Sequence, residues 1–333
     1  MLNHFIEQKT CEYLGFTPTE EQAELISQLA IFLAEATPRN AFVLKGYAGT
    51  GKTSVVSAVV KLLTELEQSV VLLAPTGRAA KVLSSYSGKQ ASTIHKHIYR
   101  QQSAVADAFF DITYNPYKNA LFIVDEASMV ANAGDGVFGT GRLLDDLISY
   151  VYSGENCRLL MLGDTAQLPP VMQSDSDALD KKKLEQYDLS VQEFTLKQVV
   201  RQAEESGILH NATLIRELID TYKTPQSLCL HPEKDVIRVS GQDFTDTLHA
   251  AYRDGLEETI IVTRSNKKAS MYVDGIRNRI LAREEMISGG DLVMVVKNNY
   301  TVGKDYKGFE FIANGDVAEV VRVRGYIEMY DCV

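Results

Sequence analysis

Residues 46–53 read GYAGTGKT, between an apolar run and a segment with helical spacing. They fit the pattern G-x-x-x-x-G-K-[ST], in which small residues let consecutive backbone N–H groups turn toward phosphate oxygens. Lys52 adds a charge and Thr53 a hydroxyl for Mg²⁺. AFVLKG before the loop is typical of a buried strand, and SVVSAVVKLLTEL after it predicts a helix, whose N-terminus would face the phosphates. The stretch predicts a nucleotide-binding loop made of Gly46, Ala48, Gly49, Thr50, Gly51, Lys52, Thr53 and Ser54.

The bulk composition is that of a soluble multidomain protein. A chain of 333 residues is too long for one ordinary core, and 45% hydrophobic with 23% charged residues is typical of globular proteins. No apolar stretch is long enough to span a bilayer, and the start, MLNHFIEQKT, lacks the layout of a signal peptide. We expect a cytoplasmic protein with no membrane partner. The four cysteines are far apart, which indicates neither a zinc site nor a disulfide framework.

The charge is unevenly distributed along the chain. A net charge of −10 argues against a polyanionic partner, yet residues 68–106 contain no Asp or Glu and several Lys and Arg. A second basic run, residues 264–283, contains Asp274 as its single acid. Such tracts are most often solvated faces, so a nucleic-acid surface is the less common alternative on composition alone.

Three further apolar runs repeat the design of a strand followed by a polar turn. They are SVVLLAPTGRAAKVLSSY at 69–86, LFIVDEASM at 121–129 and RLLMLGDTAQLPPV at 158–171. Strands that alternate with helices at this spacing predict an α/β fold with a doubly wound parallel sheet. In such sheets the ligands bind at the carboxyl ends of the strands.

Polar residues follow two of these strands. Asp125 would hold Mg²⁺ through water, and Glu126 would polarise a water for attack on the γ-phosphate. Asp164 and Gln167 together resemble a γ-phosphate sensor, although each alone fits an ordinary turn or surface residue. An ordinary acidic turn remains the alternative for the two adjacent acids. Transfer of phosphate to a small acceptor needs no activated water, so Glu126 favours hydrolysis over a phosphotransferase.

Six motifs, GYAGTGKT, APTGRAA, TIHK, VDEASM, GDTAQLPPV and LKQVVRQ, occur in the order seen in RecD-like helicases of superfamily 1. The chain also resembles the Dda type, and the resemblance covers roughly residues 15–320. It implies a P-loop NTPase with two RecA-like domains that clamp ATP and Mg²⁺ between them. It further implies a motor that moves 5′ to 3′ on single-stranded DNA, of the kind used in DNA repair and recombination.

The resemblance assigns roles to individual residues. Gln22 corresponds to a glutamine that contacts adenine, whereas its position three residues after Thr19 predicts a capping box; both could hold if the side chain switches. Arg201 in VVRQ resembles an arginine that reaches ATP from the second domain, and alone would be a helix-surface charge. The implied catalytic residues are Lys52, Asp125, Glu126, Gln167 and Arg201, and the implied metal ligands are Thr53 and Asp125.

The implied DNA contacts are Pro75, Thr76, Arg78, Thr93 and His95, within the acid-free tract. Hydroxyls and backbone amides fix a phosphate path in such proteins. A core histidine is the alternative for His95. Nothing in the sequence reads a 2′-hydroxyl, so RNA is not excluded as the partner. The sequence names no partner subunit, whether a nuclease or a repair complex.

The resemblance also divides the chain. Residues 1–178 would form the first RecA-like domain, with a small insertion at about 99–120 whose aromatic residues suit either a strand-separating wedge or their own small core. Residues 179–288 would form an incomplete second RecA-like domain, with strands at 235–240 and 259–265, and residues 289–333 a partial SH3-like β-barrel.

The departure from the family comes at the end, GYIEMYDCV, where the later helicase motifs do not appear. One of those motifs carries an arginine for the transferring phosphate, a role worth about 10³- to 10⁵-fold in rate in related NTPases. We therefore expect a fragment that binds ATP and Mg²⁺ but hydrolyses ATP and unwinds DNA weakly. A non-catalytic, ATP-gated binding module for nucleic acid is a further alternative.

Overall fold

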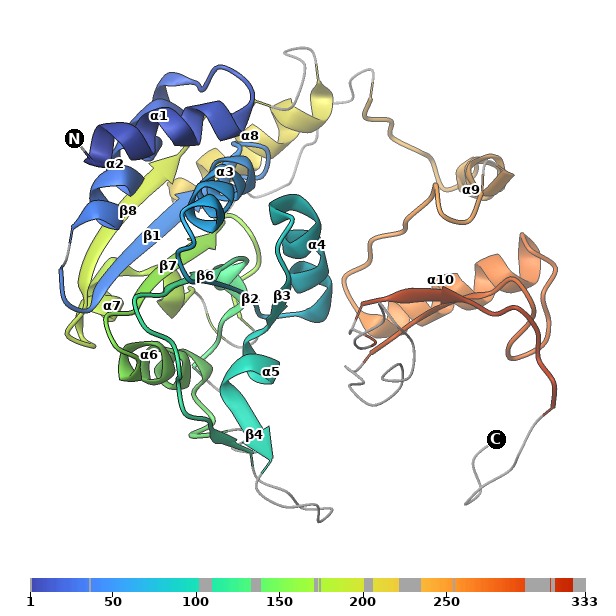
Figure 1. Cartoon of the computed structure of the whole chain (residues 1–333). Coiled ribbons are helices and arrows are strands. Elements are labelled where there is room, and N and C mark those ends of the chain that lie inside the picture. The colour runs from blue at the N-terminus through green and yellow to red at the C-terminus, as the bar shows by residue number, and fades with distance from the viewer. Residues whose placement is uncertain are drawn as a thin grey trace. The chain divides into compact units, whose positions relative to one another are not determined.

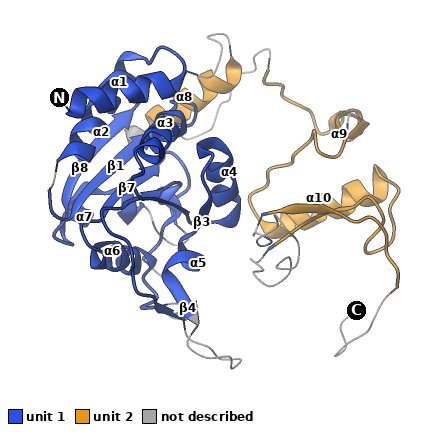
Figure 2. Ribbon diagram, in the orientation of Figure 1, with its two compact units in different colours: residues 1–203, 296–315 blue, residues 204–295, 316–333 orange. Residues whose placement is uncertain are grey.

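The structure is a computed structural model that describes residues 2–35, 37–101, 110–132, 139–170, 173, 175–200, 206–221, 235–253, 255–296, 312 and 315–325. The chain divides into two compact units (Figure 2). Unit 1 comprises residues 1–203 and 296–315, and unit 2 comprises residues 204–295 and 316–333.

Unit 1 contains a six-stranded sheet in which every neighbouring pair is parallel (Figure 1). The order across the sheet is β3-β2-β6-β7-β1-β8. The strands are β1 (Asn40–Gly46), β2 (Val70–Ala74), β3 (Ala91–Thr93), β6 (Leu121–Val124), β7 (Arg158–Gly163) and β8 (Ser190–Leu196).

Helices cover both faces of this sheet because its central strands are apolar on both sides. In β1, Phe42 and Leu44 pack with α1 (Leu2–Leu14), α2 (Glu20–Ala34), α3 (Lys52–Glu65) and α4 (Gly77–Ser87). The alternate residues, Ala41 and Val43, pack with α5 (Ile94–Ile98), α6 (Leu143–Ser153) and α7 (Lys181–Glu185) on the other face. The predicted α/β fold with a doubly wound parallel sheet is therefore confirmed.

Unit 1 extends past the predicted boundary at residue 178. The short 3₁₀ helix η2 (Asp177–Leu179) buries Leu179 in the core, and β8 then pairs with β1 from Asn40 opposite Ser190 to Gly46 opposite Leu196. The sequence of β8, SVQEFTL, alternates apolar and polar residues because it lies at the edge of the sheet. The polar stretch before β8 is therefore part of unit 1.

The insertion forms a small antiparallel hairpin of β4 (Tyr99–Gln101) and β5 (Phe110–Ile112). Its base is fixed by the Tyr99 hydroxyl, which donates to the buried carboxylate of Asp146 on α6 at 2.6 Å. Residues 102–109 lie outside the described residues, so the strand-separating wedge stays a prediction.

Unit 2 contains α8 (Gly207–Asp220), α9 (Phe244–Arg253) and α10 (Asn266–Arg279), with an antiparallel pair of β9 (Leu292–Met294) and β10 (Val317–Glu319). Residues 235–240 and 259–263 form no regular strand in the described part of the chain. Their apolar side chains lack the burial that favours strands: Ile237 is 81% exposed and Ile260 is 87% exposed. The second RecA-like domain and the SH3-like barrel stay predictions.

One buried carboxylate organises the described part of unit 2. Asp291 accepts hydrogen bonds from Arg277 at 2.9 Å, from Arg283 at 2.7 Å and from the backbone N–H of Ser288 at 2.7 Å. The hydrogen bond from Arg277 is the main cause that lowers the pKa of Asp291 to about 2. The cluster ties α10 to the start of β9.

No helix in the described residues combines the length and the hydrophobicity that a membrane crossing requires.

Candidate functional site

A cavity of about 180 Å³ lies at the carboxyl edge of the sheet. Three segments that follow strands meet there: the loop after β1, the acids after β6 and the turn after β7. This is the edge at which doubly wound sheets bind ligands. The lining residues are Tyr47, Ala48, Gly49, Gly51, Lys52, Thr53, Ser54, Asp125, Glu126, Gly163 and Gln167.

The glycines of the loop are required by its backbone. Gly49 and Gly51 have φ angles of +83° and +87°, which side chains other than hydrogen rarely allow. A Cβ on Gly51 would lie 2.4 Å from Nε2 of Gln22, and one on Gly46 would lie 3.0 Å from the carbonyl oxygen of Leu196. The loop is therefore packed against both α2 and the end of β8.

Lys52 begins α3 directly after the N-cap residue Gly51. Its ammonium donates to the carbonyl oxygens of Gly46 and Tyr47, the second at 3.0 Å. The first-turn N–H groups of a helix carry a partial positive charge, so this end of α3 and the ammonium together favour an anion. Six of the eight predicted loop residues line the cavity, whereas Gly46 and Thr50 do not.

The two adjacent acids both have raised pKa values. Burial raises the pKa of Asp125, against the opposing effects of the Glu126 N–H, 2.9 Å from Asp125 Oδ1, and of the Lys52 charge. Burial, followed by the charge of Asp125, raises the pKa of Glu126, and a hydrogen bond from Gln167 opposes that rise. The site therefore holds a carboxylate with increased affinity for a proton.

Asp164, predicted together with Gln167 as part of a γ-phosphate sensor, also affects Glu126. It is 4% exposed, its Oδ1 accepts from the N–H of Ala166 at 2.8 Å and its carbonyl oxygen accepts from the N–H of Gln167 at 3.2 Å. Its charge is a further cause of the raised pKa of Glu126. Asp164 therefore shapes the turn that carries Gln167, as an ordinary turn residue would, and it also acts on the acid beside it.

Gln22 forms the predicted capping box. Its N–H donates to Oγ1 of Thr19 at 3.3 Å, and its Oε1 accepts from the N–H of Thr19 at 3.1 Å. In the same conformation, Nε2 of Gln22 donates to the carbonyl oxygen of Thr50 at 3.0 Å. The side chain thus fixes α2 to the phosphate loop without a switch, and its contact with adenine stays a prediction.

The predicted DNA contacts gather where β2 and β3 end side by side, with Ala74 opposite Thr93. Thr76 caps α4 by accepting from the N–H of Ala79 at 3.2 Å, and Thr93 caps α5 by accepting from the N–H of Lys96 at 3.2 Å. Both hydroxyls therefore have a structural role in addition to the predicted contact with DNA. Arg78 is exposed on the first turn of α4.

The other two predicted DNA contacts differ in surroundings. Pro75 is half-buried directly after β2, between the strand and the cap of α4. His95 is half-buried in α5, with its ring centroid 5.7 Å from that of Tyr99, and burial lowers its pKa. A neutral imidazole is therefore favoured at this position, as expected for the alternative of a structural histidine.

Arg201 lies outside the described residues. The segment that leads to it passes the phosphate loop, because the N–H of Val200 donates to the carbonyl oxygen of Gly49 at 3.0 Å.

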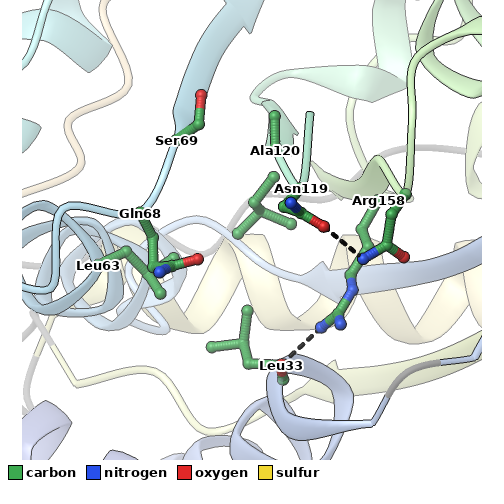
Figure 3. A pocket seen from close by; sticks show the side chains of 9 residues that line it. Leu33, Leu63, Gln68, Ser69, Asn119, Ala120 and Arg158 are labelled. Carbon is green, nitrogen blue, oxygen red and sulfur yellow. Dashed lines mark hydrogen bonds between the residues drawn. The ribbon is translucent and has the colours of Figure 1, made fainter. Parts of the chain in front are cut away.

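A second cavity, of about 210 Å³, lies at the opposite edge, where β2, β6 and β7 begin (Figure 3). Three of its polar side chains bond to groups of the protein itself. Nδ2 of Asn156 donates to Oδ1 of Asn119 at 2.7 Å, and Nη1 of Arg158 donates to the carbonyl oxygens of Phe32, at 3.0 Å, and Leu33. Those carbonyls belong to the last turn of α2. The cavity is thus lined by groups that hold the sheet to α2.

Comparisons with known proteins agree with the geometry of the carboxyl edge. The ATP-dependent RecD2 DNA helicase of Deinococcus radiodurans is 38% identical over 154 residues, which are 46% of this chain and 18% of that protein. The ATP-dependent DNA helicase dda of Enterobacteria phage T4 is 29% identical over 147 residues, which are 40% of this chain and 29% of that protein. This chain therefore spans less than a third of the length of either relative.

Among solved structures, the Pif1 helicase from Candida albicans matches with a TM-score of 0.44 and 16% identity, over 90% of this chain and 63% of that one. A family profile described as an AAA domain matches residues 17–221, more than half of the chain. The chain belongs to this AAA domain family, and it is a relative of the RecD-like and Dda-like superfamily 1 helicases.

Proposed function

We propose that this protein is an ATP-dependent 5′–3′ DNA helicase or translocase that couples ATP hydrolysis to movement along single-stranded DNA. One observation carries the proposal: a single cavity gathers the phosphate loop, Lys52, the two acids with raised pKa values and Gln167. The relationship to RecD-like and Dda-like helicases supports DNA as the polymer.

The residues of the cavity fit ATP and Mg²⁺. The Thr53 hydroxyl and the Asp125 carboxylate are oxygen donors of the kind that Mg²⁺ prefers, both line the cavity, and they would hold the ion. Mg²⁺ would supply neutralisation of the phosphate charge. On binding, the Lys52 ammonium would leave the carbonyls of Gly46 and Tyr47 for the phosphates. The peptide oxygens that it leaves are neutral, so the exchange favours the charged ligand.

Glu126 is the proposed base for the attacking water. A general base works best when its pKa approaches the working pH, and burial moves Glu126 in that direction. The hydrogen bond from Gln167 fixes the carboxylate in the cavity and makes Gln167 the proposed sensor of the γ-phosphate. Arg201 is proposed to reach the nucleotide from the segment that follows β8. The second RecA-like domain is proposed to begin after β8 rather than at residue 179 and to end near residue 288, with residues 289–333 as the partial barrel.

The DNA path is proposed to cross the ends of β2 and β3, over Pro75, Thr76, Arg78, Thr93 and His95. The Thr76 hydroxyl, backbone N–H groups and the exposed Arg78 guanidinium suit phosphates and sugars better than base edges, which fits a motor without sequence preference. Thr93 is fully buried and would act by holding the start of α5 in place. The protein is proposed to act in the cytoplasm.

The decisive experiment measures the ATPase rate with no polymer, with single-stranded DNA and with single-stranded RNA. We expect DNA to stimulate the wild-type rate and Lys52→Ala to abolish it, while the control Lys61→Ala, an exposed lysine on the same helix, leaves it unchanged. Stimulation by RNA alone would make the protein an RNA helicase. Nucleotide binding without stimulation by either polymer would make it an ATP-gated binding module.

The direction of movement needs a separate test. Duplexes with a 5′ or a 3′ single-stranded tail should be offered with ATP, and we expect unwinding of the 5′-tailed duplex alone. Weak unwinding with clear DNA-stimulated hydrolysis fits the expectation of reduced activity, whereas unwinding from the 3′ tail contradicts the proposed polarity.

A further inference from the structure

The segment that leaves the sheet of unit 1 is fastened to the first turn of α2. β8 runs parallel to β1 and ends level with it, since Leu196 pairs with Gly46. The ion pair of Lys45 with Glu193, at 2.9 Å, lies across the same two strands. Residues 197–200 therefore emerge beside the phosphate loop, and they are the last described residues before the chain enters unit 2 at Glu204.

The carboxylate of Glu21 joins the two segments through hydrogen bonds. Its Oε2 accepts hydrogen bonds from the backbone N–H groups of Lys197, at 2.8 Å, and Gln198, at 2.9 Å. One carboxylate oxygen thus accepts from two consecutive amides that lie beyond the sheet ladder. Hydrogen bonds to an ionised acceptor are shorter and stronger than those between neutral groups.

The first turn of α2 also contacts the phosphate loop. Gln22, the next residue, donates to the carbonyl oxygen of Thr50, and the N–H of Val200 donates to that of Gly49 at 3.0 Å. The first turn of α2, the phosphate loop and the exit segment 197–200 are thereby joined in a closed set of contacts. A movement of the loop cannot leave the exit segment in place without breaking at least one of them.

We infer that Glu21 is a positioning residue that clips the exit segment 197–200 to the phosphate loop, so that nucleotide occupancy of the loop is transmitted to the chain that enters unit 2. Glu21 itself is outside the cavity lining. The response to nucleotide rests on the proposed function, whereas the clip does not.

The test is hydrogen exchange resolved to single amides in the full chain, without nucleotide and with a saturating non-hydrolysable ATP analogue and Mg²⁺. Glu21→Ala removes the acceptor, Glu21→Gln keeps one uncharged acceptor oxygen, and Glu20→Ala is the matched control. Glu20 is the other acid of the first turn of α2 and is exposed, so both alanine variants lose the same helix-dipole interaction. Binding of the analogue is titrated separately for each variant.

In the nucleotide-free protein we expect Glu21→Ala to speed exchange at Lys197 and Gln198 about tenfold, with partial rescue in Glu21→Gln and no change in Glu20→Ala. In wild type and Glu20→Ala we expect the analogue to change exchange at Val200 by about threefold or more, and in Glu21→Ala we expect that response to disappear.

Equal exchange at the two amides in Glu21→Ala and Glu20→Ala would overturn the clip. A Val200 response that survives in Glu21→Ala would overturn the coupling. If the titration shows no binding of the analogue to wild type, the proposed function and the coupling fail together, and the nucleotide-free comparison still decides the clip.

Discussion

The two edges of the parallel sheet use polar residues in opposite ways. At the amino edge, Arg158 donates to carbonyl oxygens of α2 and holds the sheet to that helix, and Asn156 donates to Asn119. At the carboxyl edge, Asp125 and Glu126 are half-buried beside one another with raised pKa values. Polar groups that satisfy each other stabilise a fold, whereas buried like charges reduce its stability and are retained at functional sites. Substitutions at the two edges should therefore separate activity from stability.

The largest effect is expected for Glu126→Gln. We expect the ATPase rate to fall by about 100-fold or more because the proposed base is lost. We also expect the melting temperature of the nucleotide-free protein to rise, since a buried charge beside Asp125 and Asp164 is removed. Steady-state ATPase assays and thermal unfolding measure the two changes. Glu24→Gln, an exposed acid on α2, is the control and should change neither. Wild-type hydrolysis by Glu126→Gln would contradict the assignment.

Arg158→Met should lower stability and leave the ATPase rate nearly unchanged. Methionine keeps most of the apolar stem but cannot donate to the carbonyl oxygens of Phe32 and Leu33, so we expect the free energy of unfolding to fall by about 2 kcal/mol. The ATPase kcat should stay within about twofold once the protein is folded. Denaturant unfolding checks the first value.

The control for that variant is Arg142→Met. The Arg142 side chain is 59% exposed and pairs with Asp145 at 2.9 Å, a surface ion pair that is worth at most about 0.5 kcal/mol. A large loss of kcat in Arg158→Met, with stability unchanged, would show that the amino edge takes part in catalysis.

Gln22→Glu tests a side chain that serves both a helix cap and the phosphate loop. Glutamate keeps the acceptor oxygen of the capping box but replaces the donor to the Thr50 carbonyl with a negative charge. We expect nucleotide affinity to fall about tenfold with little loss of stability, because an acceptor would face an acceptor beside the loop. Thr19→Ala, which removes the cap alone, should instead cost about 1 kcal/mol of stability and leave affinity unchanged. Equilibrium titration with a fluorescent nucleotide decides between them.

The smallest effect is a change in the pH dependence of stability. A carboxylate whose pKa is higher in the folded than in the unfolded state binds protons more tightly when folded. The nucleotide-free protein should lose stability as pH rises from about 4.3, the unfolded value of a glutamate, through the raised folded pKa of Glu126. Glu126→Gln should flatten this slope, and activity should show the opposite trend, falling as pH drops through the same window. Identical stability slopes in the two proteins would contradict the raised pKa.

Predictions of local structure from residues near each other in the sequence agree with the structure, while the roles of these residues toward nucleotide and Mg²⁺ stay predictions. The phosphate loop, the acids after β6 and the cap at Gln22 are readable because each consists of a strand or helix end and the residues directly beside it. The central strands can also be predicted from local sequence, because burial on both faces makes them continuous apolar runs.

The sequence did not predict features that depend on pairing between segments far apart in the chain. β8 is an edge strand with alternating polarity, so its sequence resembles a surface segment, and its place beside β1 moves the end of unit 1 to residue 203. The contacts of Glu21 with Lys197 and Gln198 require that same pairing and have no local signal. Residues 235–240 and 259–265 were predicted to be strands, but their local sequence specifies no partner strand, and neither of these described ranges forms a regular strand.

The place of β1 between β7 and β8 has a consequence for how the protein is made. Asn40 pairs with Ser190, so the strand that carries the phosphate loop is completed on one side by residues that leave the ribosome much later. Closing such a distant pair is slow and follows synthesis of the whole sheet. A ribosome-bound chain that ends before β8 emerges should therefore expose one edge of β1, and the step that completes the sheet should also be the one that brings residues 197–200 to the loop.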